Sequence, residues 1–178
     1  MHGPLQLESG LLEGLNSERF GTAAELEQLL ERHQASAAAV VMAAAVADQR
    51  LQQPLSGKLS KQELQEVLHS PASWEMVPDL LHQMVQRRSA DQVLMGFAAH
   101  SGDVLTQAEA KFQRKGCDLL FANPIDQPGV GFAASANQGW LLSRGASPEA
   151  MGPCSKLALA HGLLDHLRLR LPQAARAD

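Results

Sequence analysis

The stretch that decides the fold is residues 92–123, QVLMGFAAHSGDVLTQAEAKFQRKGCDLLFAN. Its apolar start, residues 92–99, predicts a short strand, and residues 104–115 predict a helix with an unusually basic last turn. Residues 117–123 predict a second strand that stops at Asn-Pro. A strand, a helix and a strand in this order indicate a right-handed crossover between parallel strands. We therefore expect an α/β fold of Rossmann-like type, three layers (α/β/α) around a mostly parallel sheet.

The residues before this unit continue the alternation. Thr22 and Glu25 form a capping-box pattern, which predicts a helix over residues 22–33. Residues 37–47 are a continuous run of small and β-branched apolar residues, typical of a buried parallel strand whose carboxyl end meets solvent. A helix is expected from Pro78 to about Arg88, because proline suits a first helical turn.

Three other segments complete the expected order. Residues 51–76 show no sustained period, which favours a flexible loop over the site. Residues 132–143 hold two strand-like pieces around a turn at residues 137–139, a small β-hairpin extension. Residues 155–169 predict a last helix.

The length of 178 residues suits one domain, residues 1–178. The first ten residues resemble the end of a strand and its exit turn. An open parallel sheet usually carries its phosphate-binding glycine turn in a preceding strand-loop-helix unit, and we expect that this unit is lacking.

Composition excludes several classes of function. Fifteen Lys and Arg against 19 Asp and Glu give a formal charge of −4, which offers no general attraction for nucleic acid or for an anionic membrane. No run approaches the roughly 18 apolar residues of a membrane helix, and the Met1 end lacks the pattern of a secretory signal, so a cytoplasmic protein is expected.

Metal and disulfide chemistry is also disfavoured. Cys117 and Cys154 are far apart, which fits neither a zinc site nor a disulfide framework. The seven histidines are scattered, so no histidine metal site is expected, and metal ligands stay unknown. A hydrolase or a reductase would need a nucleophile elbow or a dinucleotide glycine fingerprint, and the sequence has neither.

The carboxyl ends of the strands are where ligands bind in open α/β sheets. Small residues at 43–45 would let a flat ring approach the backbone, and Asp48 could accept hydrogen bonds from an amino or hydroxyl group. The alternative is tight packing of a helix on the sheet, with Asp48 as a cap or loop residue. Phe97 at a strand end could stack on a base, although an aromatic residue there is more often core.

Basic residues offer phosphate ligands. Lys58 and Lys61 lie in the expected loop, where an ammonium group could close over a phosphate, but loop lysines are usually only solvated. Lys111, Arg114 and Lys115 share one helical face and could grip a triphosphate. A basic last turn is equally explained by the helix dipole.

Taken in order, several runs resemble motifs of the phosphopantothenate-cysteine ligase domain, the C-terminal half of a bacterial bifunctional coenzyme A biosynthesis flavoprotein. They are AAAVAD (43–48), KLSK (58–61), VPDL (77–80), GFAA (96–99) and KFQRKGCDLLFAN (111–123), and the tail GF (131–132), Asn137 and SKL (155–157) is also similar. The resemblance covers nearly the whole chain.

The resemblance implies an activity. Such ligases use CTP, with Mg²⁺ on the triphosphate, to convert 4'-phosphopantothenate into an acyl-cytidylate; cysteine then attacks through its amine and CMP leaves. It also implies a homodimer and a flavin-dependent decarboxylase domain or chain, with no flavin bound by this chain. The choice between CTP and ATP stays open, because backbone contacts decide it.

The resemblance further implies the site residues. Lys58 is expected to act on the phosphates during transfer and is the catalytic candidate, whereas Lys111 and Lys115 would hold the phosphate chain. The remaining nucleotide contacts expected from the motifs, most of them at the pyrimidine end, are Met42, Ala43, Ala44, Asp48, Pro78, Asp79, Leu80, Leu81 and Phe97.

Four residues depart from the family pattern. Gln49 replaces a common aromatic residue, Val77 an asparagine, His100 a glutamate and Pro124 an aspartate, and the family's initial glycine-rich segment has no counterpart here. These departures leave open an alternative function, a non-catalytic nucleotide-binding or dimerising remnant of the family.

Overall fold

The computed structural model describes residues 1–4, 10, 12–129 and 134–172. The chain forms two compact units. The first comprises Met1–Leu29 and Ala44–Asp79, and the second comprises Leu30–Ala43 and Leu80–Asp178. Helix α1 (Ala23–His33) contributes residues to both.

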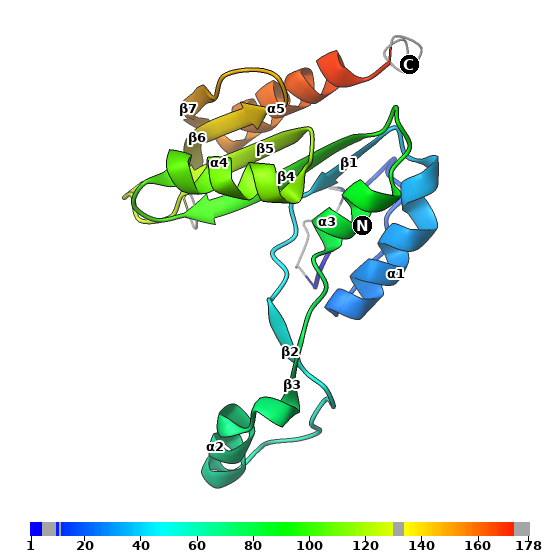
Figure 1. The fold of residues 1–178 in the computed structure, drawn as a ribbon, viewed down its shortest axis with the longest axis vertical. Helices are drawn as coiled ribbons and strands as arrows, with labels where there is room; N and C mark the ends of the chain where they lie inside the picture. Colours follow the sequence, from blue (N-terminus) through cyan, green and yellow to red (C-terminus); the bar gives the residue numbers. More distant parts are fainter. Residues whose placement is uncertain (5–9, 11, 130–133, 173–178) are drawn as a thin grey trace. The chain divides into compact units, whose positions relative to one another are not determined.

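The second unit is built on a five-stranded mixed sheet in the order β1-β4-β5-β6-β7 (Figure 1). β1, β4 and β5 are parallel, whereas β6 and β7 are antiparallel to their neighbours. The strands are β1 (Ala39–Met42), β4 (Val93–His100), β5 (Leu119–Pro124), β6 (Ala136–Ser143) and β7 (Glu149–Ser155). The expected α/β fold with a largely parallel sheet is confirmed.

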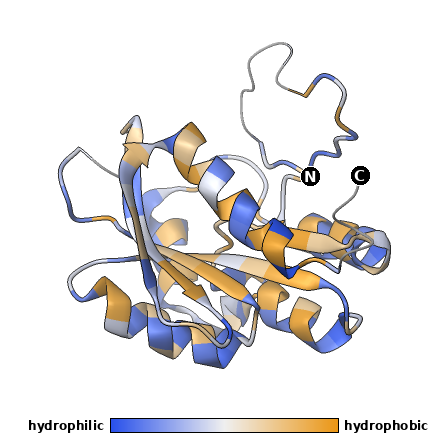
Figure 2. Cartoon of the chain, turned by 90° about the horizontal axis from the view of Figure 1, so that it is seen from above, coloured by the Kyte–Doolittle hydropathy of each residue, from blue (hydrophilic) through white to orange (hydrophobic). Residues whose placement is uncertain are grey.

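Helices cover both faces of this sheet. On one face, Leu159, Leu163 and Leu167 of α5 (Lys156–Arg170) form a buried cluster with alternate residues of β4, β5 and β6. On the other face lie α3 (Leu80–Arg87) and α4 (Val104–Lys115), which contact β4 and β5. Figure 2 shows the largely apolar strands with helices above and below them. The central strands are thus buried on both sides, as their continuous apolar sequence predicted.

The crossover at residues 92–123 agrees closely with the sequence. α4 has the predicted bounds, begins at the Asp103 cap, whose side chain accepts from the Thr106 N–H, and ends at Gly116. Gly116 has a left-handed φ of 70°, which glycine adopts without strain. Both flanking strands lie within two residues of their predicted bounds.

β1 is shorter than expected. The prediction of a buried strand over residues 37–47 is wrong at both ends, because only Ala39–Met42 pairs, with β4. β1 is an edge strand and is only partly buried. Residues 43–47 have no regular structure, since their small side chains supply little apolar surface to hold a strand in place.

Residues 51–76 are not the irregular loop that the sequence suggested. They contain α2 (Lys61–His69), a 3₁₀ turn at Pro71–Ser73 and β3 (Trp74–Met76), and β3 pairs antiparallel with β2 (Gln49–Leu51) in the first unit. α2 starts with a capping box in which Ser60 and Glu63 exchange hydrogen bonds. Arg50 and Glu75 form an ion pair across the two strands at 2.5 Å.

A small β-hairpin, formed by β6 and β7, does extend the sheet, but its predicted turn at residues 137–139 is wrong. Residues 136–143 form one strand, β6, and the chain reverses after it, at residues 144–148, before β7. Gly139 lies within this strand, close to the backbone of β5. A Cβ at this position would lie 2.1 Å from the Ala122 carbonyl oxygen, so only glycine allows this close approach. The start of the predicted hairpin, including Phe132, lies outside the described residues.

A charged cluster fastens the amino ends of the central strands. Asp118 precedes β5, accepts the Leu94 N–H of β4 at 2.9 Å and pairs with Arg88. Arg144 approaches the other Asp118 oxygen at 3.5 Å and donates to the Gly116 carbonyl. Only 16% of the Asp118 side chain is exposed, so its charge depends on these partners.

Asp118→Asn is therefore expected to lower the free energy of unfolding by about 2 kcal/mol, because it leaves Arg88 without its anion in a partly buried site. Urea unfolding followed by circular dichroism measures this. Asp91→Asn is the control, because Asp91 is exposed nearby and should change stability little. Equal stability of the two variants would contradict the assignment.

Candidate functional site

The carboxyl edge of the parallel strands brings together part of the predicted site within the second unit. Met42 ends β1 opposite Gly96 of β4, and Phe97 follows in β4 opposite Phe121 of β5. Leu80 and Leu81 begin α3 on one face of this sheet. Parallel pairing thus places residues that are far apart in sequence at one edge.

Leu80 and Leu81 are core residues. Their side chains are buried, and a Cβ on Gly96 would meet Leu81 Cδ2 at 2.5 Å. What they can offer a ligand is therefore the backbone N–H groups at the start of α3, where a helix has free donors.

Phe97 also belongs mainly to the core. Its ring meets that of Phe121 edge-on, with centroids 5.8 Å apart and planes at 65°, and it packs against the cluster beneath α5. The residue as a whole is only partly buried.

The two lysines of α4 occupy different places along the helix. α4 leaves the carboxyl end of β4 and leads to the amino end of β5, so its last turn points away from the carboxyl edge. Lys111 lies in the second half of α4, and its positive charge lowers the pKa of His100, the last residue of β4. Lys115 lies four residues farther, about 6 Å along the helix axis, beside the Gly116 cap.

The remaining residues predicted to contact the nucleotide belong to the first unit, with the exception of Ala43. Ala43 is the last residue of the segment Leu30–Ala43, which belongs to the second unit. Ala43 and Ala44 are exposed in the irregular segment after β1, as the expected backbone approach requires. The carbonyl of Asp48 accepts the Val77 N–H at 2.9 Å, next to β2 and β3, and its residue is exposed. Pro78 and the exposed Asp79 follow this bond directly.

Lys58 lies in the irregular segment just before α2. Lys58 is exposed to solvent, and Gly57 before it has a positive φ of 81°. Lys61, by contrast, is the first residue of α2. The capping box fixes where the helix begins, so Lys58 is left on the irregular side.

Sequence reasoning missed a cavity of 420 Å³ at the carboxyl end of β5. The start of α4, Pro124 and Gln127 line it on one side, and Gln138, Trp140 and Met151 of the antiparallel strands line it on the other. Its indole and amide groups suit a ligand that is flat or forms hydrogen bonds. No periodic pattern marks these residues, because the β6–β7 pairing that assembles them was not foreseen.

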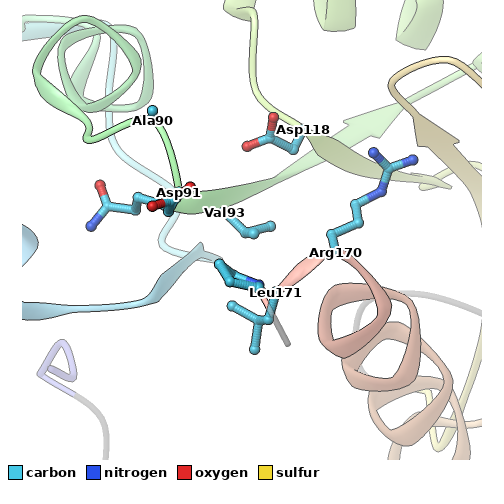
Figure 3. Close-up of a pocket in the computed structure, with 8 residues that line it drawn as sticks. Ala90, Asp91, Val93, Asp118, Arg170 and Leu171 are labelled. Carbon is cyan, nitrogen blue, oxygen red and sulfur yellow. The ribbon is translucent and has the colours of Figure 1, made fainter. Parts of the chain in front are cut away.

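A second cavity, of 520 Å³, lies at the opposite, amino edge of the sheet. Figure 3 shows Asp118 and Arg170 at this opening, with Ala90 and Asp91 across from them. Arg170 donates to the Arg144 carbonyl at 3.0 Å, and Asp118 serves the cluster described above. These groups are therefore engaged in holding the fold.

Across the described residues, no group of three or more His, Cys, Asp or Glu side chains could hold a metal ion. Helices in the same part of the chain are too short or too polar to cross a membrane. Both cysteines are free thiols, and burial raises the pKa of Cys117 to about 11, so this thiol is unreactive near neutral pH.

Phe97→Leu is expected to lower the free energy of unfolding by about 1 kcal/mol, and Phe97→Ala by about 3 kcal/mol, because the ring packs against Phe121 and the buried cluster. Thermal and urea unfolding measure both. Leu169→Ala is the control, since Leu169 is 68% exposed. A Phe97→Ala protein as stable as this control would show that the ring is not part of the core.

The sequence matches the family described as DNA/pantothenate metabolism flavoprotein C-terminal domain over residues 1–170. It is 34% identical to the coenzyme A biosynthesis bifunctional protein CoaBC of Mycolicibacterium smegmatis, over 89% of this chain and 40% of that protein. The corresponding protein of Bacillus subtilis is 26% identical over 93% of this chain and 39% of its own length. The chain thus spans about 40% of the length of the curated relatives it matches.

Solved structures share the fold. The C-terminal domain of a CoaBC protein superposes with a TM-score of 0.71 at 20% identity, covering 94% of this chain and 72% of that one. A flavoprotein from Streptococcus pneumoniae, described with the same family name, gives a TM-score of 0.66 at 13% identity, over 92% of this chain and 75% of that one.

Proposed function

Because this chain belongs to the DNA/pantothenate metabolism flavoprotein C-terminal domain family, we propose that it carries phosphopantothenate-cysteine ligase activity in coenzyme A biosynthesis. The observation that carries the proposal is the family match over residues 1–170, together with 34% identity to a protein named for coenzyme A biosynthesis. The substrates are 4'-phosphopantothenate and cysteine, and CTP activates the carboxylate.

The reaction has two steps. The carboxylate of 4'-phosphopantothenate attacks the α-phosphate of CTP, forming an acyl-cytidylate and releasing diphosphate. The amine of cysteine then attacks the acyl carbon, the amine loses a proton, and CMP leaves. Both steps develop negative charge on phosphate oxygens, so nearby cations stabilise them.

The chain's lysines supply these cations. Lys58, exposed on an irregular segment, is suited to approach bound phosphates and to stabilise charge during transfer. Lys111, whose charge acts on His100 at the carboxyl edge, is suited to hold the phosphate chain in place. Lys115 contributes from one turn farther along the same helix face.

The nucleotide base needs backbone groups and a flat apolar wall. The exposed residues Ala43 and Ala44 after Met42 support this role, as do the N–H groups at Leu80 and Leu81 and the partly buried Phe97. Asp48, Pro78 and Asp79 complete the proposed set. Mg²⁺ usually binds substrate phosphates with only one or two carboxylates, and we propose that it accompanies the triphosphate of CTP.

The proposal includes partners. We propose a homodimer that works with a flavin-dependent decarboxylase, as a domain or as a separate chain, because the curated relatives are bifunctional and longer than this chain. It also places the reaction in the cytoplasm. The departures at Val77, His100 and Pro124 favour one alternative, a family member that binds nucleotide without turnover.

Lysine variants test the activity. Lys58→Met is expected to lower kcat for diphosphate release about 100-fold with little change in KM for CTP, because it removes a charge needed mainly during transfer. Lys111→Met is expected to raise KM for CTP about tenfold, because a charge-assisted phosphate contact is lost. A coupled diphosphate assay with 4'-phosphopantothenate, cysteine and CTP measures both.

Lys156→Met on α5 is the matched control, because Lys156 is an exposed lysine that the proposal does not use. Wild-type rates in Lys58→Met and Lys111→Met would exclude their roles. Calorimetric binding of CTP to the wild-type chain without any diphosphate release would instead favour the non-catalytic alternative.

A further inference from the structure

His100 ends β4 at the carboxyl edge and lies opposite Pro124 of β5. Its carbonyl accepts the Ile125 N–H at 3.0 Å, which fixes its backbone. Its ring nitrogen Nε2 is buried and, among the described residues, is the one buried side-chain nitrogen or oxygen without a hydrogen-bond partner. Leaving a buried nitrogen without a hydrogen bond destabilises the fold by about 1–3 kcal/mol, so its presence calls for a functional reason.

The surroundings of His100 form a short chain of polar groups. Gln107 of α4 shares a side-chain hydrogen bond with His100. The amide nitrogen of Gln107 donates to the carbonyls of Ser101 at 2.6 Å and Asp103 at 3.2 Å, which turns its oxygen to accept from the imidazole. Lys111 lies four residues after Gln107 and so on the same side of α4.

The surroundings of His100 disfavour its charged form. Burial, and then the positive charge of Lys111, lower the pKa of His100, while the bond to Gln107 raises it in part. Two carboxylates on adjoining segments are already engaged: Asp103 accepts the Thr106 N–H, and Asp126 accepts the Gly102 N–H at 2.8 Å. After burial, Lys111 is the charged group that opposes protonation of this imidazole.

We propose that His100 is a second, switchable cation of the nucleotide site, neutral in the empty protein and protonated when a phosphate chain binds at Lys111. The inference rests on the proposed function, because it needs phosphates at Lys111. Bound phosphates offset the ammonium charge that opposes the imidazolium, and they add negative charge beside it. His100 then contributes attraction for phosphates only when they are present.

The sign of the pH dependence follows. Nucleotide binding raises the pKa of His100 above its value in the empty protein, so binding takes up a proton at pH values between the two. Affinity for the nucleotide therefore falls as pH rises through this window. Above the higher pKa, His100 is neutral in both states and contributes no pH dependence.

Isothermal titration of the full chain with CTP and excess Mg²⁺ tests the proposal, in two buffers of different ionisation enthalpy at about pH 6. The wild type is expected to take up a substantial fraction of one proton per CTP, and its affinity should fall up to about tenfold by about pH 8. His100→Gln should lose both effects. The ionisation of the nucleotide is common to both proteins, so the difference belongs to His100.

His161→Gln is the matched control, because His161 is an exposed histidine of α5, and it should take up protons as the wild type does. If His100→Gln does not fold, as judged by circular dichroism, His100→Asn replaces it. Equal heats in the two buffers for the wild type, or undiminished proton uptake in the His100 variant, would overturn the inference. A wild-type chain that does not bind CTP at any pH would instead contradict the proposed function.

Discussion

The parallel pairing of β4 with β5, buried under helices on both faces, is the constraint on which the second unit depends. The register from Met95–Leu119 to His100–Pro124 fixes where each residue of the crossover lies. Since backbone groups in a doubly covered sheet cannot reach water, a slip in register would leave donors and acceptors unpaired. The same register sends polar residues to the two edges, His100 and Asn123 to one and Asp118 to the other.

The two edges differ in how their charges are used. At the amino edge, Asp118 connects the starts of both central strands and forms ion pairs with Arg88 and Arg144. The charges at this edge therefore stabilise the fold. At the carboxyl edge, burial and the positive charge of Lys111 disfavour the charged form of His100, and the nearby carboxylates Asp103 and Asp126 accept backbone N–H groups. This is the edge at which open sheets bind ligands.

The crossover was predictable because its signals are local. Its apolar runs, the cap at Asp103 and the glycine at 116 lie within one stretch, and the structure follows them. The sequence did not predict β7 because Gly152 and Pro153 are unfavourable inside a strand. β7 forms through its pairing with β6, which the local sequence does not show. α2 was missed because its nine residues are all at least partly exposed, so no buried face marks it against the surrounding polar sequence.

The candidate site was predictable only as far as residue type allows. The sequence identifies the lysines and an aromatic residue at a strand end, but packing decides what each residue can offer a ligand. Phe97 packs against Phe121 in the core, and the side chains of Leu80 and Leu81 are buried, so these leucines offer only backbone groups. His100 shows most clearly what sequence alone cannot predict. The sequence shows a histidine where the family commonly has a glutamate, but it does not show that the Nε2 atom is buried without a partner or that Gln107 is a neighbour. A carboxylate at this position would attract the Lys111 ammonium group and oppose its attraction for phosphates, whereas an imidazole whose charged form is disfavoured does not oppose it.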